Sequence, residues 1–394
     1  MDFNDPKSEV VVLVGGGFAG LTTALSLSRR KNRSKIILIE PRPRFVFLPL
    51  LFELLSGEVT LWEIAPTYKS LVEEKGIVLI QEHVTSIDTV EQKVITDSGL
   101  EVNYTKVVIC SGSKPDDFGI PGVLEHALTF HNFRDVQLLK ELINELKDLK
   151  ERFPNVVVVG AGPTGVELAC KLSDLLKGKA QIHLVELESK VLPNGKAFNQ
   201  EQSERALNKR GIKVHLQTKV TSITANNVQL ERIQTTSSDF FHLSYIGLIW
   251  TAGSRAVIPE IIPRSSLKQK RISIDAYLNV IGYENVLAIG DVAFNKDVPY
   301  PVSAQVAMQQ GKLAARNLIA SSQGSNLEVF KFNDFGEMIS LGIGKASITA
   351  FGITLAGSIA FQARRIAYLT KTPHFSLKIR SATAWLLSHS KKCK

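Results

Sequence analysis

Near its start the chain has glycines spaced for a phosphate-binding turn, because Gly15, Gly17 and Gly20 fit the pattern G-x-G-x-x-G. The first glycine allows a tight turn, the second lets the backbone approach a pyrophosphate, and the third allows close helix–strand packing. The helix that begins here would point free N–H groups at the diphosphate. The next apolar stretch, KIILIE, ends in Glu40, whose carboxylate can accept hydrogen bonds from ribose hydroxyls. The stretch therefore predicts a dinucleotide site.

The same arrangement recurs further along the chain. Gly160, Gly162 and Gly165 follow the apolar stretch 156–159, and the stretch QIHLVE ends in Glu186. Two complete fingerprints in one chain predict two dinucleotides, usually a flavin in one fold and a nicotinamide in the other. A carboxylate at Glu186 suits the free 2′-hydroxyl of NADH and repels the 2′-phosphate of NADPH, so we expect a preference for NADH.

The elements that must position these turns are alternating apolar strands and helical patterns, which are typical of an α/β protein with parallel sheets. With 394 residues, 44% of them hydrophobic, the chain is long enough for two or three domains. Its cysteines are Cys110, Cys170 and Cys393, with no CxxC pair and no spacing that resembles a metal site. Cys110 and Cys170 lie in apolar patterns, which favours buried packing. The N-terminal stretch lacks the features of a secretory signal or a transit peptide.

The net charge of +9 is concentrated at one end of the chain. No Asp or Glu occurs from Met338 to Lys394, and the first 337 residues carry equal numbers of acidic and basic side chains. The basic residues of this acid-free stretch are Lys345, Arg364, Arg365, Lys371, Lys378, Arg380, Lys391, Lys392 and Lys394. All of the excess positive charge therefore belongs to this C-terminal stretch, which requires an explanation of its own.

Two further runs resemble the two-dinucleotide flavoprotein superfamily. The run NVLAIGDVA (285–293) is similar to its second flavin-binding sequence, in which the aspartate, here Asp291, contacts the ribityl–phosphate part of FAD. The run 107–122 resembles the superfamily's other crossing, although Cys110, Ser111 and Gly112 stand where the superfamily usually has Ala, Thr and Gly. The run 249–256 resembles the return strand of the nicotinamide domain, which implies that Gly253 lies near the nicotinamide.

The superfamily resemblance implies two Rossmann-like dinucleotide-binding domains and a C-terminal segment. The expected divisions are a discontinuous FAD-binding domain at 1–120 and 265–330, an NAD(P)H-binding domain at 121–264, and a C-terminal membrane-association and quinone-access domain at 331–394.

Within the superfamily the chain resembles the type II NADH dehydrogenases, which are single-chain NAD(P)H:quinone oxidoreductases. Disulfide reductases need a redox-active cysteine pair beside the flavin, and sulfide:quinone reductases also use cysteines there, so both branches are disfavoured. The likeness runs nearly end to end, through FVFLPLLFELLSGEV (45–59), GPTGVELA (162–169), AQVAMQQG (304–311) and FGEMISLGIGKA (335–346). It implies an FAD enzyme that passes two electrons from NADH or NADPH to a membrane quinone without pumping protons.

Three segments look like the cyanobacterial and plastid branch: 54–66, GEMISLG (336–342) and ARRIAYL (363–369). Some members of that branch reduce prenylated naphthoquinones, including demethylphylloquinone on the route to phylloquinone. The resemblance therefore implies a naphthoquinone or plastoquinone as acceptor. It also implies a peripheral, monotopic location on the cytoplasmic side of a membrane, such as the thylakoid or plasma membrane of a cyanobacterium.

Glu167 follows the second fingerprint, and two interpretations of it stay open. A carboxylate in the first turn of a helix gains about 0.3–1 kcal/mol from the helix dipole. The resemblance instead places Glu167 near the contact of nicotinamide and flavin, where it would assist hydride transfer or proton movement.

The stretch SAQVAMQQG (303–311) predicts a helix that Ser303 caps and that runs to about Ile319. The resemblance places its start, Ala304 and Gln305, at the pyrimidine edge of the flavin. Gln305 and Gln309 share one helix face, and we expect them to bind a quinone carbonyl. Gln310 lies further round and is expected to be solvated. The alternative is that all these glutamines cover a solvated helix surface.

The uncharged run 346–363 has a borderline length for a transmembrane helix, but its Gly, Ser and Thr residues disfavour one. The final stretch, 374–394, places apolar residues on one helical stripe with Trp385 beside it and basic residues around it. This pattern predicts an interfacial helix on an anionic membrane surface. A helix docked on the protein's own core or at a homodimer interface stays an alternative, and nucleic acid is disfavoured because the remaining chain is neutral.

Two other functions stay open at this point. One is a soluble flavin reductase of a protein partner such as ferredoxin, and the other is an NADH-binding redox sensor with slow turnover.

Overall fold

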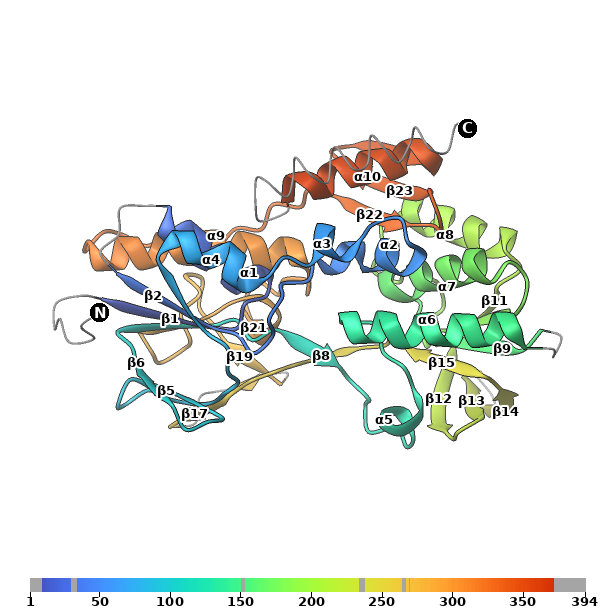
Figure 1. The fold of residues 1–394 in the computed structure, drawn as a ribbon, viewed down its shortest axis with the longest axis horizontal. Helices are drawn as coiled ribbons and strands as arrows, with labels where there is room; N and C mark the ends of the chain where they lie inside the picture. Colours follow the sequence, from blue (N-terminus) through green and yellow to red (C-terminus); the bar gives the residue numbers. More distant parts are fainter. Residues whose placement is uncertain are drawn as a thin grey trace. The chain divides into compact units, whose positions relative to one another are not determined.

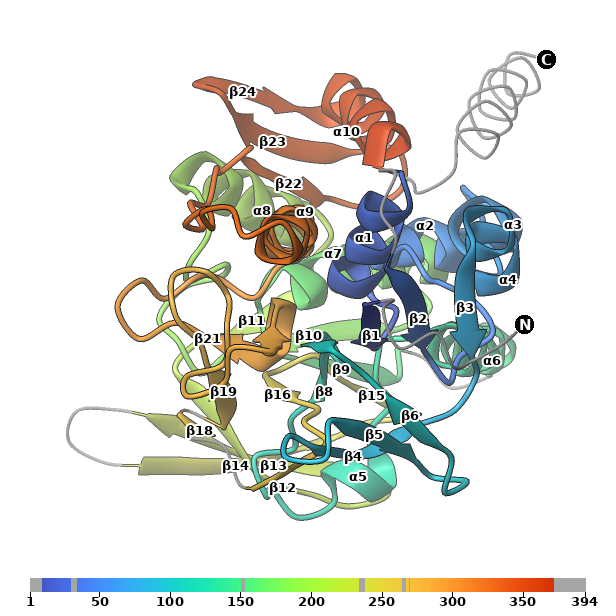
Figure 2. The same cartoon turned by 90° about the vertical axis from the view of Figure 1, so that its left-hand side faces the viewer.

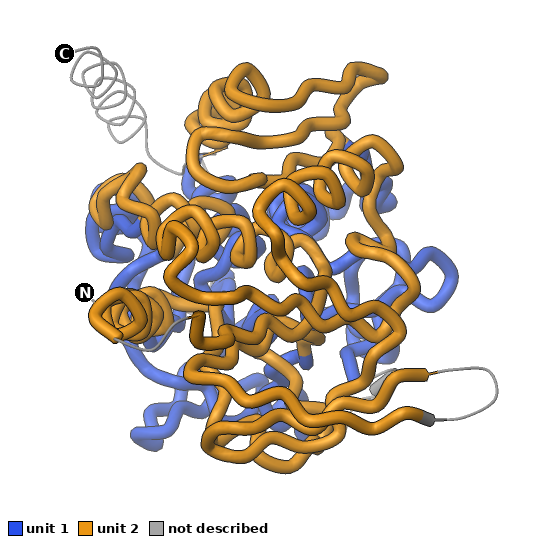
Figure 3. Tube along the Cα trace, turned by 90° about the vertical axis from the view of Figure 1, so that its right-hand side faces the viewer, with its two compact units in different colours: residues 1–45, 65–114, 255–334 blue, residues 46–64, 115–254, 335–394 orange. Residues whose placement is uncertain are grey.

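The computed structural model describes residues 9–29, 34–149, 153–233, 238–263, 267–268 and 270–371. The chain forms two compact units, coloured separately in Figure 3. Unit 1 comprises Met1–Phe45, Ala65–Lys114 and Arg255–Asp334, and unit 2 comprises Val46–Ile64, Pro115–Ser254 and Phe335–Lys394. The chain passes into the inserted part of unit 2 at β8 (Ser113–Pro115) and returns to unit 1 at β16 (Ser254–Ala256).

Unit 1 is built on a parallel five-stranded sheet, and Figure 1 labels its strands β1 (Val10–Val14) and β2 (Lys35–Ile39). Its strands are short runs of Val, Ile and Leu, as expected for a parallel sheet with both faces covered. In spatial order they are β20 (Val286–Ala288), β7 (Lys106–Ile109), β1 (Val10–Val14), β2 (Lys35–Ile39) and β3 (Ile77–Ile80). Helices α1 (Phe18–Ser28) and α9 (Ala304–Ser322) pack closely on each other. Because β1, β7 and β20 are parallel neighbours in the sheet, their carboxyl ends lie side by side at one edge.

The remaining elements of unit 1 are small. One mixed sheet contains β17 (Glu260–Ile262), β4 (Val84–Asp88), β5 (Lys93–Thr96) and β6 (Glu101–Asn103). A second contains β18 (Leu267–Lys268), β19 (Arg271–Ser273) and β21 (Ala293–Phe294). Short helices are α4 (Tyr68–Val72), η2 (Glu73–Lys75) and η3 (Gly290–Val292).

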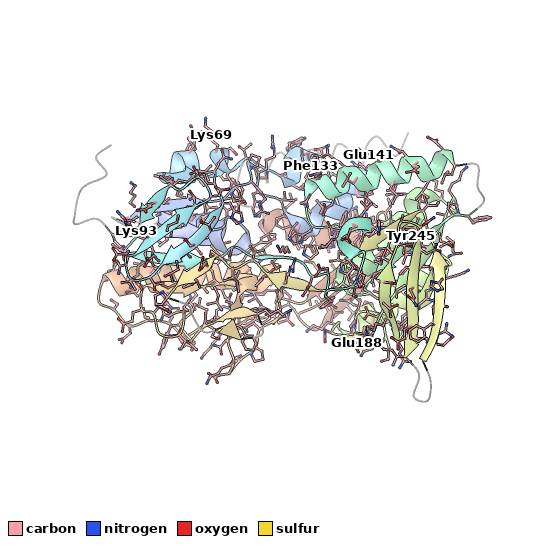
Figure 4. The ribbon with its side chains drawn as sticks, turned by 90° about the horizontal axis from the view of Figure 1, so that it is seen from below. Lys69, Lys93, Phe133, Glu141, Glu188 and Tyr245 are labelled. Atoms are coloured by element: carbon pink, nitrogen blue, oxygen red, sulfur yellow. The ribbon has the colours of Figure 1, made fainter. Side chains whose placement is uncertain are left out.

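Unit 2 contains a second parallel sheet with the order β11 (Lys213–His215), β10 (Gln181–Val185), β9 (Asn155–Val159) and β15 (Gly247–Trp250). The antiparallel strands β12 (Thr218–Ile223), β13 (Asn227–Ile233) and β14 (Ser238–Ser244) share an apolar core with it. Its helices are η1 (Leu48–Leu50), α2 (Leu51–Ser56), α3 (Leu61–Ile64), α5 (Val123–His126), α6 (Phe133–Asp148), α7 (Pro163–Leu176) and α8 (Ala197–Lys209). Figure 4 labels Phe133 and Glu141 on α6 and Tyr245 just before β15. The predicted α/β class with two Rossmann-like folds is confirmed.

The C-terminal part of unit 2 is an antiparallel sheet of β22 (Glu337–Ser340), β23 (Ala346–Ala350) and β24 (Ile353–Ala356), followed by α10 (Gly357–Lys371) (Figure 2). Ala346 and Ile348 pack against Ala360 and Phe361 of the helix. The uncharged run 346–363 thus forms two strands and the start of a helix. Across the described ranges, no helix combines the length and the apolar character that a membrane span requires.

Polar side chains attach this C-terminal sheet to other parts of unit 2. The Asn199 amide donates to the Glu337 carboxylate at 2.7 Å, Arg210 donates to the Leu341 carbonyl at 2.8 Å, and Glu58 accepts from the Gly344 N–H at 3.0 Å. The sequence-based division set 331–394 apart, whereas the structure groups 335–394 and also 46–64 with the inserted unit. The predicted interfacial helix, 374–394, lies outside the described residues.

Candidate functional site

The fingerprint turn of unit 2 has two glycines at which a built Cβ would clash, which we call closed. It has one glycine at which a built Cβ would meet no atom within 4 Å, which we call open. Gly160 has φ +99°, and a Cβ built on it would lie 3.0 Å from the backbone of Ala252. A Cβ on Gly165 would lie 1.8 Å from the carbonyl oxygen of Gly160, so the helix can approach the strand only with glycine here. A Cβ on Gly162 would meet nothing within 4 Å. The backbone at Gly162 is therefore the place where an anion can come close.

Unit 1 repeats this geometry at its own fingerprint. Gly15 has φ +103°, and its Cβ would lie 2.5 Å from the carbonyl oxygen of Cys110. The Cβ of Gly20 would lie 2.0 Å from the Gly15 carbonyl oxygen, and the Cβ of Gly17 would again meet nothing within 4 Å. The residues present therefore fit a dinucleotide pyrophosphate in both units.

Both fingerprint helices begin without a side-chain cap. The N-cap residue of α1 is Gly17 and that of α7 is Gly162, and neither can supply a capping oxygen. The N–H groups of a helix's first turn have no partner within the helix, and together with the helix dipole they form a site for an anion. The described part of each unit thus presents one such helix start at the carboxyl edge of its sheet.

The two carboxylates predicted to bind ribose, Glu40 and Glu186, differ in how many hydrogen bonds they can still accept. Glu186 accepts from the Ala161 N–H at 2.5 Å and from the Glu188 N–H at 3.0 Å, and Glu188 is labelled in Figure 4. A carboxylate has about four acceptor positions, so about two stay available for ribose hydroxyls. Glu186 therefore fits the role of a ribose acceptor.

At Glu40 all of these acceptor positions are engaged. The carboxylate accepts from the Gly16 N–H at 2.7 Å and from three N–H groups of Arg42. Burial alone would raise the pKa of Glu40, but the bonds and charge of Arg42 hold this pKa below its ordinary value. A ribose can reach Glu40 only by replacing one of these bonds, and the half-exposed Arg42 side chain is the partner that can move.

The predicted FAD-contacting residues of unit 1 gather around η3. The Ser113 hydroxyl donates to Oδ2 of Asp291 at 2.6 Å, and the Ser111 hydroxyl donates to the Val257 carbonyl at 2.5 Å. Gly112 has φ +76° and faces open space. These residues follow β7 and β20, which are neighbours in the sheet, so their side chains share its carboxyl edge with the first fingerprint.

Two helix starts converge on the turn that carries Asp291. A Cβ on Gly290 would lie 3.3 Å from the Cβ of Ala19 and 3.7 Å from the Cβ of Ala307. Ala19 lies in the first turn of α1 and Ala307 in the first turn of α9. The positive ends of both helix dipoles are thus directed at the same anion-binding edge.

Helix α9 begins as predicted and buries a different glutamine from those expected to be functional. Ser303 caps it by accepting from the Val306 N–H at 3.2 Å, and the helix extends to Ser322 rather than Ile319. Gln310, expected to be solvated, is only 2% exposed and accepts from the Gly290 N–H at 2.6 Å. The prediction for Gln310 was wrong because α9 crosses α1 at Gly311, which turns this face inward. Gln310 fixes the turn that presents Asp291.

Gln309 has backbone partners in unit 1. Its amide nitrogen donates to the Asn333 carbonyl at 2.8 Å, and its amide oxygen accepts from the Asn333 N–H at 3.0 Å. One N–H and one lone pair of the amide stay available. Gln305, one turn earlier, is partly buried.

Glu167 is a buried carboxylate within unit 2. Helix α7 begins at Pro163, so Glu167 lies beyond its first turn, and the helix-dipole interpretation of this residue was wrong. Its Oε1 accepts from the Ser340 N–H at 2.6 Å and lies 3.3 Å from Nη2 of Arg364. Burial raises the pKa of Glu167 to about 7, although Arg364 and the Ser340 N–H act in the opposite direction. Glu167 can therefore exchange a proton near neutral pH.

Arg364 connects this carboxylate to a second one. It is fully buried, forms an ion pair with Glu53, and donates to the Pro49 carbonyl at 2.8 Å. The ring of Tyr368 stacks on its guanidinium, 4.7 Å from Cζ to ring centroid. Sequence reasoning missed Glu53 and Arg364 as site residues, since 311 positions separate them and no local motif joins them.

Burial also corrects the account of the basic stretch. Arg364 and Arg365 are buried, so they do not contribute to a surface charge, whereas Lys345 and Lys371 are exposed. The other five basic residues of the stretch lie outside the described ranges. The excess charge of the acid-free stretch is thus not all at the surface, because two of its nine cations are buried.

The cysteines in the described ranges are buried, as predicted. Cys110 belongs to unit 1 and Cys170 to unit 2, and both are free thiols. Burial raises the pKa of Cys170 to about 12 and that of Cys110 even further above its ordinary value. Neither thiol has the lowered pKa of a redox nucleophile.

A family model described as pyridine nucleotide-disulphide oxidoreductase matches residues 9–311. The demethylphylloquinone reductase NdbB of Synechocystis sp. is 33% identical over 391 residues, which cover 95% of each chain. The chain belongs to this family, within its type II NADH dehydrogenase branch. A Staphylococcus aureus type II NADH:quinone oxidoreductase is 28% identical, over 89% of this chain and 92% of the relative. Among solved structures, an NDH2 from Plasmodium falciparum in complex with NADH superposes with a TM-score of 0.86. It covers 96% of this chain and 98% of its own, and at 17% identity it supports the fold of this type II enzyme.

Proposed function

We propose that the protein is an FAD-dependent NAD(P)H:quinone oxidoreductase that transfers two electrons to a membrane quinone. The observation that carries the proposal is the duplicated turn, in which an open Gly17 and an open Gly162 each precede an uncapped helix. Two such turns in one chain bind two dinucleotides, and the buried, unpaired Cys110 and Cys170 oppose a disulfide as the electron acceptor.

The binding residues divide between the units. Unit 1 would hold FAD through Gly15, Gly17, Gly20, Glu40, Ser111, Gly112, Asp291, Ala304 and Gln305. Unit 2 would hold NADH or NADPH through Gly160, Gly162, Gly165, Glu186 and Gly253. The free acceptor positions of Glu186 favour the 2′-hydroxyl of NADH.

When bound, FAD supplies the two-electron chemistry between nicotinamide and quinone. The first-turn N–H groups of α1 and α9 would stabilise negative charge on the bound cofactor. Gln310 and Ser113 would hold Asp291 in place for the ribityl–phosphate part. Gln305 and the remaining hydrogen-bonding groups of Gln309 would meet the quinone carbonyl.

Glu167 would hold and release a proton during turnover, because its pKa of about 7 matches a neutral working pH. Arg364 would keep that pKa from rising further. Replacing Glu167 by Gln removes the proton and keeps the acceptor for Ser340. If Glu167→Gln leaves both flavin reduction and quinone turnover unchanged, Glu167 has no catalytic role.

The quinone is proposed to be a prenylated naphthoquinone such as demethylphylloquinone, with plastoquinone as the second choice. The support is the 33% identity to the demethylphylloquinone reductase NdbB of Synechocystis sp. and the three segments that resemble the cyanobacterial and plastid branch. Prenylated quinones dissolve in the bilayer, so the protein must reach a membrane surface.

The described residues offer an apolar face for that contact. Ile359 and Ile366 are exposed and lie seven positions apart on α10, so they share a face, and Phe351 and Ile353 are exposed in the β23–β24 hairpin. No acidic residue occurs in this stretch. Truncation after Pro373 is expected to weaken vesicle binding, and Ile359→Ser with Ile366→Ser in the full chain tests the helix face separately. Unchanged binding by the truncated chain would show that 374–394 is not the anchor.

Steady-state NADH oxidation tests the function directly. We expect fast turnover with a short-chain naphthoquinone and slow turnover with ferredoxin or without an added acceptor. Faster turnover with ferredoxin would support the flavin reductase alternative, and slow turnover with every acceptor would support the redox sensor. Gln305→Ala is expected to lose quinone reduction and keep flavin reduction by NADH. An equal loss of both would remove Gln305 from the quinone site.

A further inference from the structure

Unit 2 exposes an aromatic ring in a backbone conformation that such a residue rarely adopts. Phe118 is 60% exposed and has φ +51°. A side chain with a Cβ costs about 1–2 kcal/mol in this left-handed region, and a large exposed apolar ring gains nothing from burial. Neither the exposed ring nor the left-handed backbone stabilises the folded state, which points to a contact made by the ring as the reason for a phenylalanine here.

The loop that carries Phe118 is firmly held. The indole N–H of Trp250, which lies in the core of unit 2, donates to the Asp116 carbonyl at 2.8 Å. The Phe118 N–H donates to the Asp116 carboxylate at 3.1 Å, and the Gly119 N–H donates to the Asp117 carboxylate at 3.3 Å. The position of the ring is thus set by the fold.

The tip of the ring lies on Gly253. A Cβ built on Gly253 would lie 2.2 Å from Cζ and 2.5 Å from Cε2 of Phe118, so the two residues are in direct contact. The preceding residue, Ala252, is the one that closes off the Cβ position of Gly160. A series of direct contacts therefore connects Phe118, through Gly253 and Ala252, to Gly160 in the fingerprint turn.

The order of strands in the sheet indicates which half of a bound dinucleotide lies near these residues. Glu186 follows β10, and Gly253 follows β15, and these two strands flank β9 on opposite sides. In Rossmann folds the acid after the second strand holds the adenosine ribose, and the pyrophosphate lies over the fingerprint after the first strand. The other half of the dinucleotide then extends past the end of β15, where Phe118 and Gly253 lie.

We propose that the Phe118 ring packs against the nicotinamide half of the bound nucleotide and is a binding determinant for that half alone. The inference rests on the proposed function, since it requires that unit 2 binds NADH. A ring already fixed by its loop loses little freedom on binding, which makes it an efficient contact.

The test compares two ligands on the full-length, FAD-loaded protein by calorimetry. One is 1,4,5,6-tetrahydro-NADH, which cannot donate a hydride, and the other is ADP-ribose, which lacks the nicotinamide. Phe118→Ala should lower the affinity for the tetrahydro analogue about three- to tenfold, the range of one aromatic contact. The affinity for ADP-ribose should stay unchanged. Phe118→Trp should keep the wild-type affinity for both. The matched control is Phe153→Ala, which removes another exposed phenylalanine of unit 2, 64% exposed with φ +61°.

Each other outcome overturns the inference in a distinct way. Equal weakening of both ligands in Phe118→Ala would mean that the residue only supports the loop. Unchanged affinity for the tetrahydro analogue in Phe118→Ala would mean that the ring does not touch the nicotinamide half. A wild-type protein that binds neither ligand would overturn the proposed nucleotide site itself, and the inference with it.

Discussion

Nη2 of Arg364 lies 3.3 Å from Oε1 of Glu167, and both side chains are buried within unit 2. The same guanidinium pairs with Glu53, so one buried cation serves two buried carboxylates. Burial is the largest cause that raises the pKa of Glu167, and the Glu53 carboxylate adds a smaller contribution, while Arg364, the Ser340 N–H and Lys171 oppose the shift.

Glu167→Gln should change how stability depends on pH. The pKa of Glu167 is about 7 in the folded protein against an ordinary value of 4.5, so the folded state binds more protons between these pH values. Its contribution to stability is therefore present below pH 4.5 and is lost as the pH rises to about 7. Chemical denaturation should show the wild type losing stability relative to Glu167→Gln across this window. A constant difference would contradict the raised pKa.

Arg364→Met should be among the most destabilising single changes in unit 2. It would leave Glu53 and Glu167 buried without their cation, at a cost of about 3–5 kcal/mol in the free energy of unfolding. The double variant Glu53→Gln with Arg364→Met should recover part of this loss. Lys345→Met removes an exposed cation of the same stretch and should change stability by less than about 0.5 kcal/mol. Equal effects of Arg364→Met and Lys345→Met in denaturation curves would contradict the buried cluster.

Gly165→Ala should destabilise the fold much more than Gly162→Ala, because only the first glycine is needed for close packing. The first places a methyl group 1.8 Å from the Gly160 carbonyl, and we expect a loss on the order of 3 kcal/mol in unfolding free energy. The second faces open space at an extended φ of −67°, and its cost should stay below about 1 kcal/mol. Thermal denaturation of the two variants measures the contrast, which the structure requires to be in this order.

Gln310→Leu should loosen the turn that carries Asp291. The Gly290 N–H would lose its acceptor inside the protein, which costs about 1–3 kcal/mol. We expect FAD to dissociate more readily from this variant, as measured by reconstitution of the apoprotein. Lys312→Leu, on the exposed side of the same helix, is the control. FAD retention equal to that control would rule out the proposed role of Gln310.

The contrast between Gln310 and the fingerprints shows where sequence reasoning works in this chain. The turn geometry at Gly15, Gly17 and Gly20 follows from local spacing, because a turn and a helix start depend on neighbouring residues. The start of α9 at Ser303 was predictable for the same reason. Which face of α9 is buried depends on its crossing with α1 at Gly311, which no local pattern contains.

The Glu53–Arg364–Glu167 cluster was even harder to predict from the sequence. Its members come from three helices that are distant in sequence, α2, α7 and α10. By residue type alone, Arg364 is one of nine basic residues in an acid-free stretch and counts toward the excess charge of that stretch. Only the packing of α10 on the other helices of unit 2 reveals it as a buried partner of two carboxylates.

The central claim is that the open turn at Gly162 binds NADH and the open turn at Gly17 binds FAD. Anaerobic rapid mixing of Gly162→Val tests it most directly, with flavin absorbance as the signal. We predict that this variant retains FAD, is not reduced by NADH, and after chemical reduction is reoxidised by a short-chain naphthoquinone at the wild-type rate. Reduction of Gly162→Val by NADH at the wild-type rate would contradict the account.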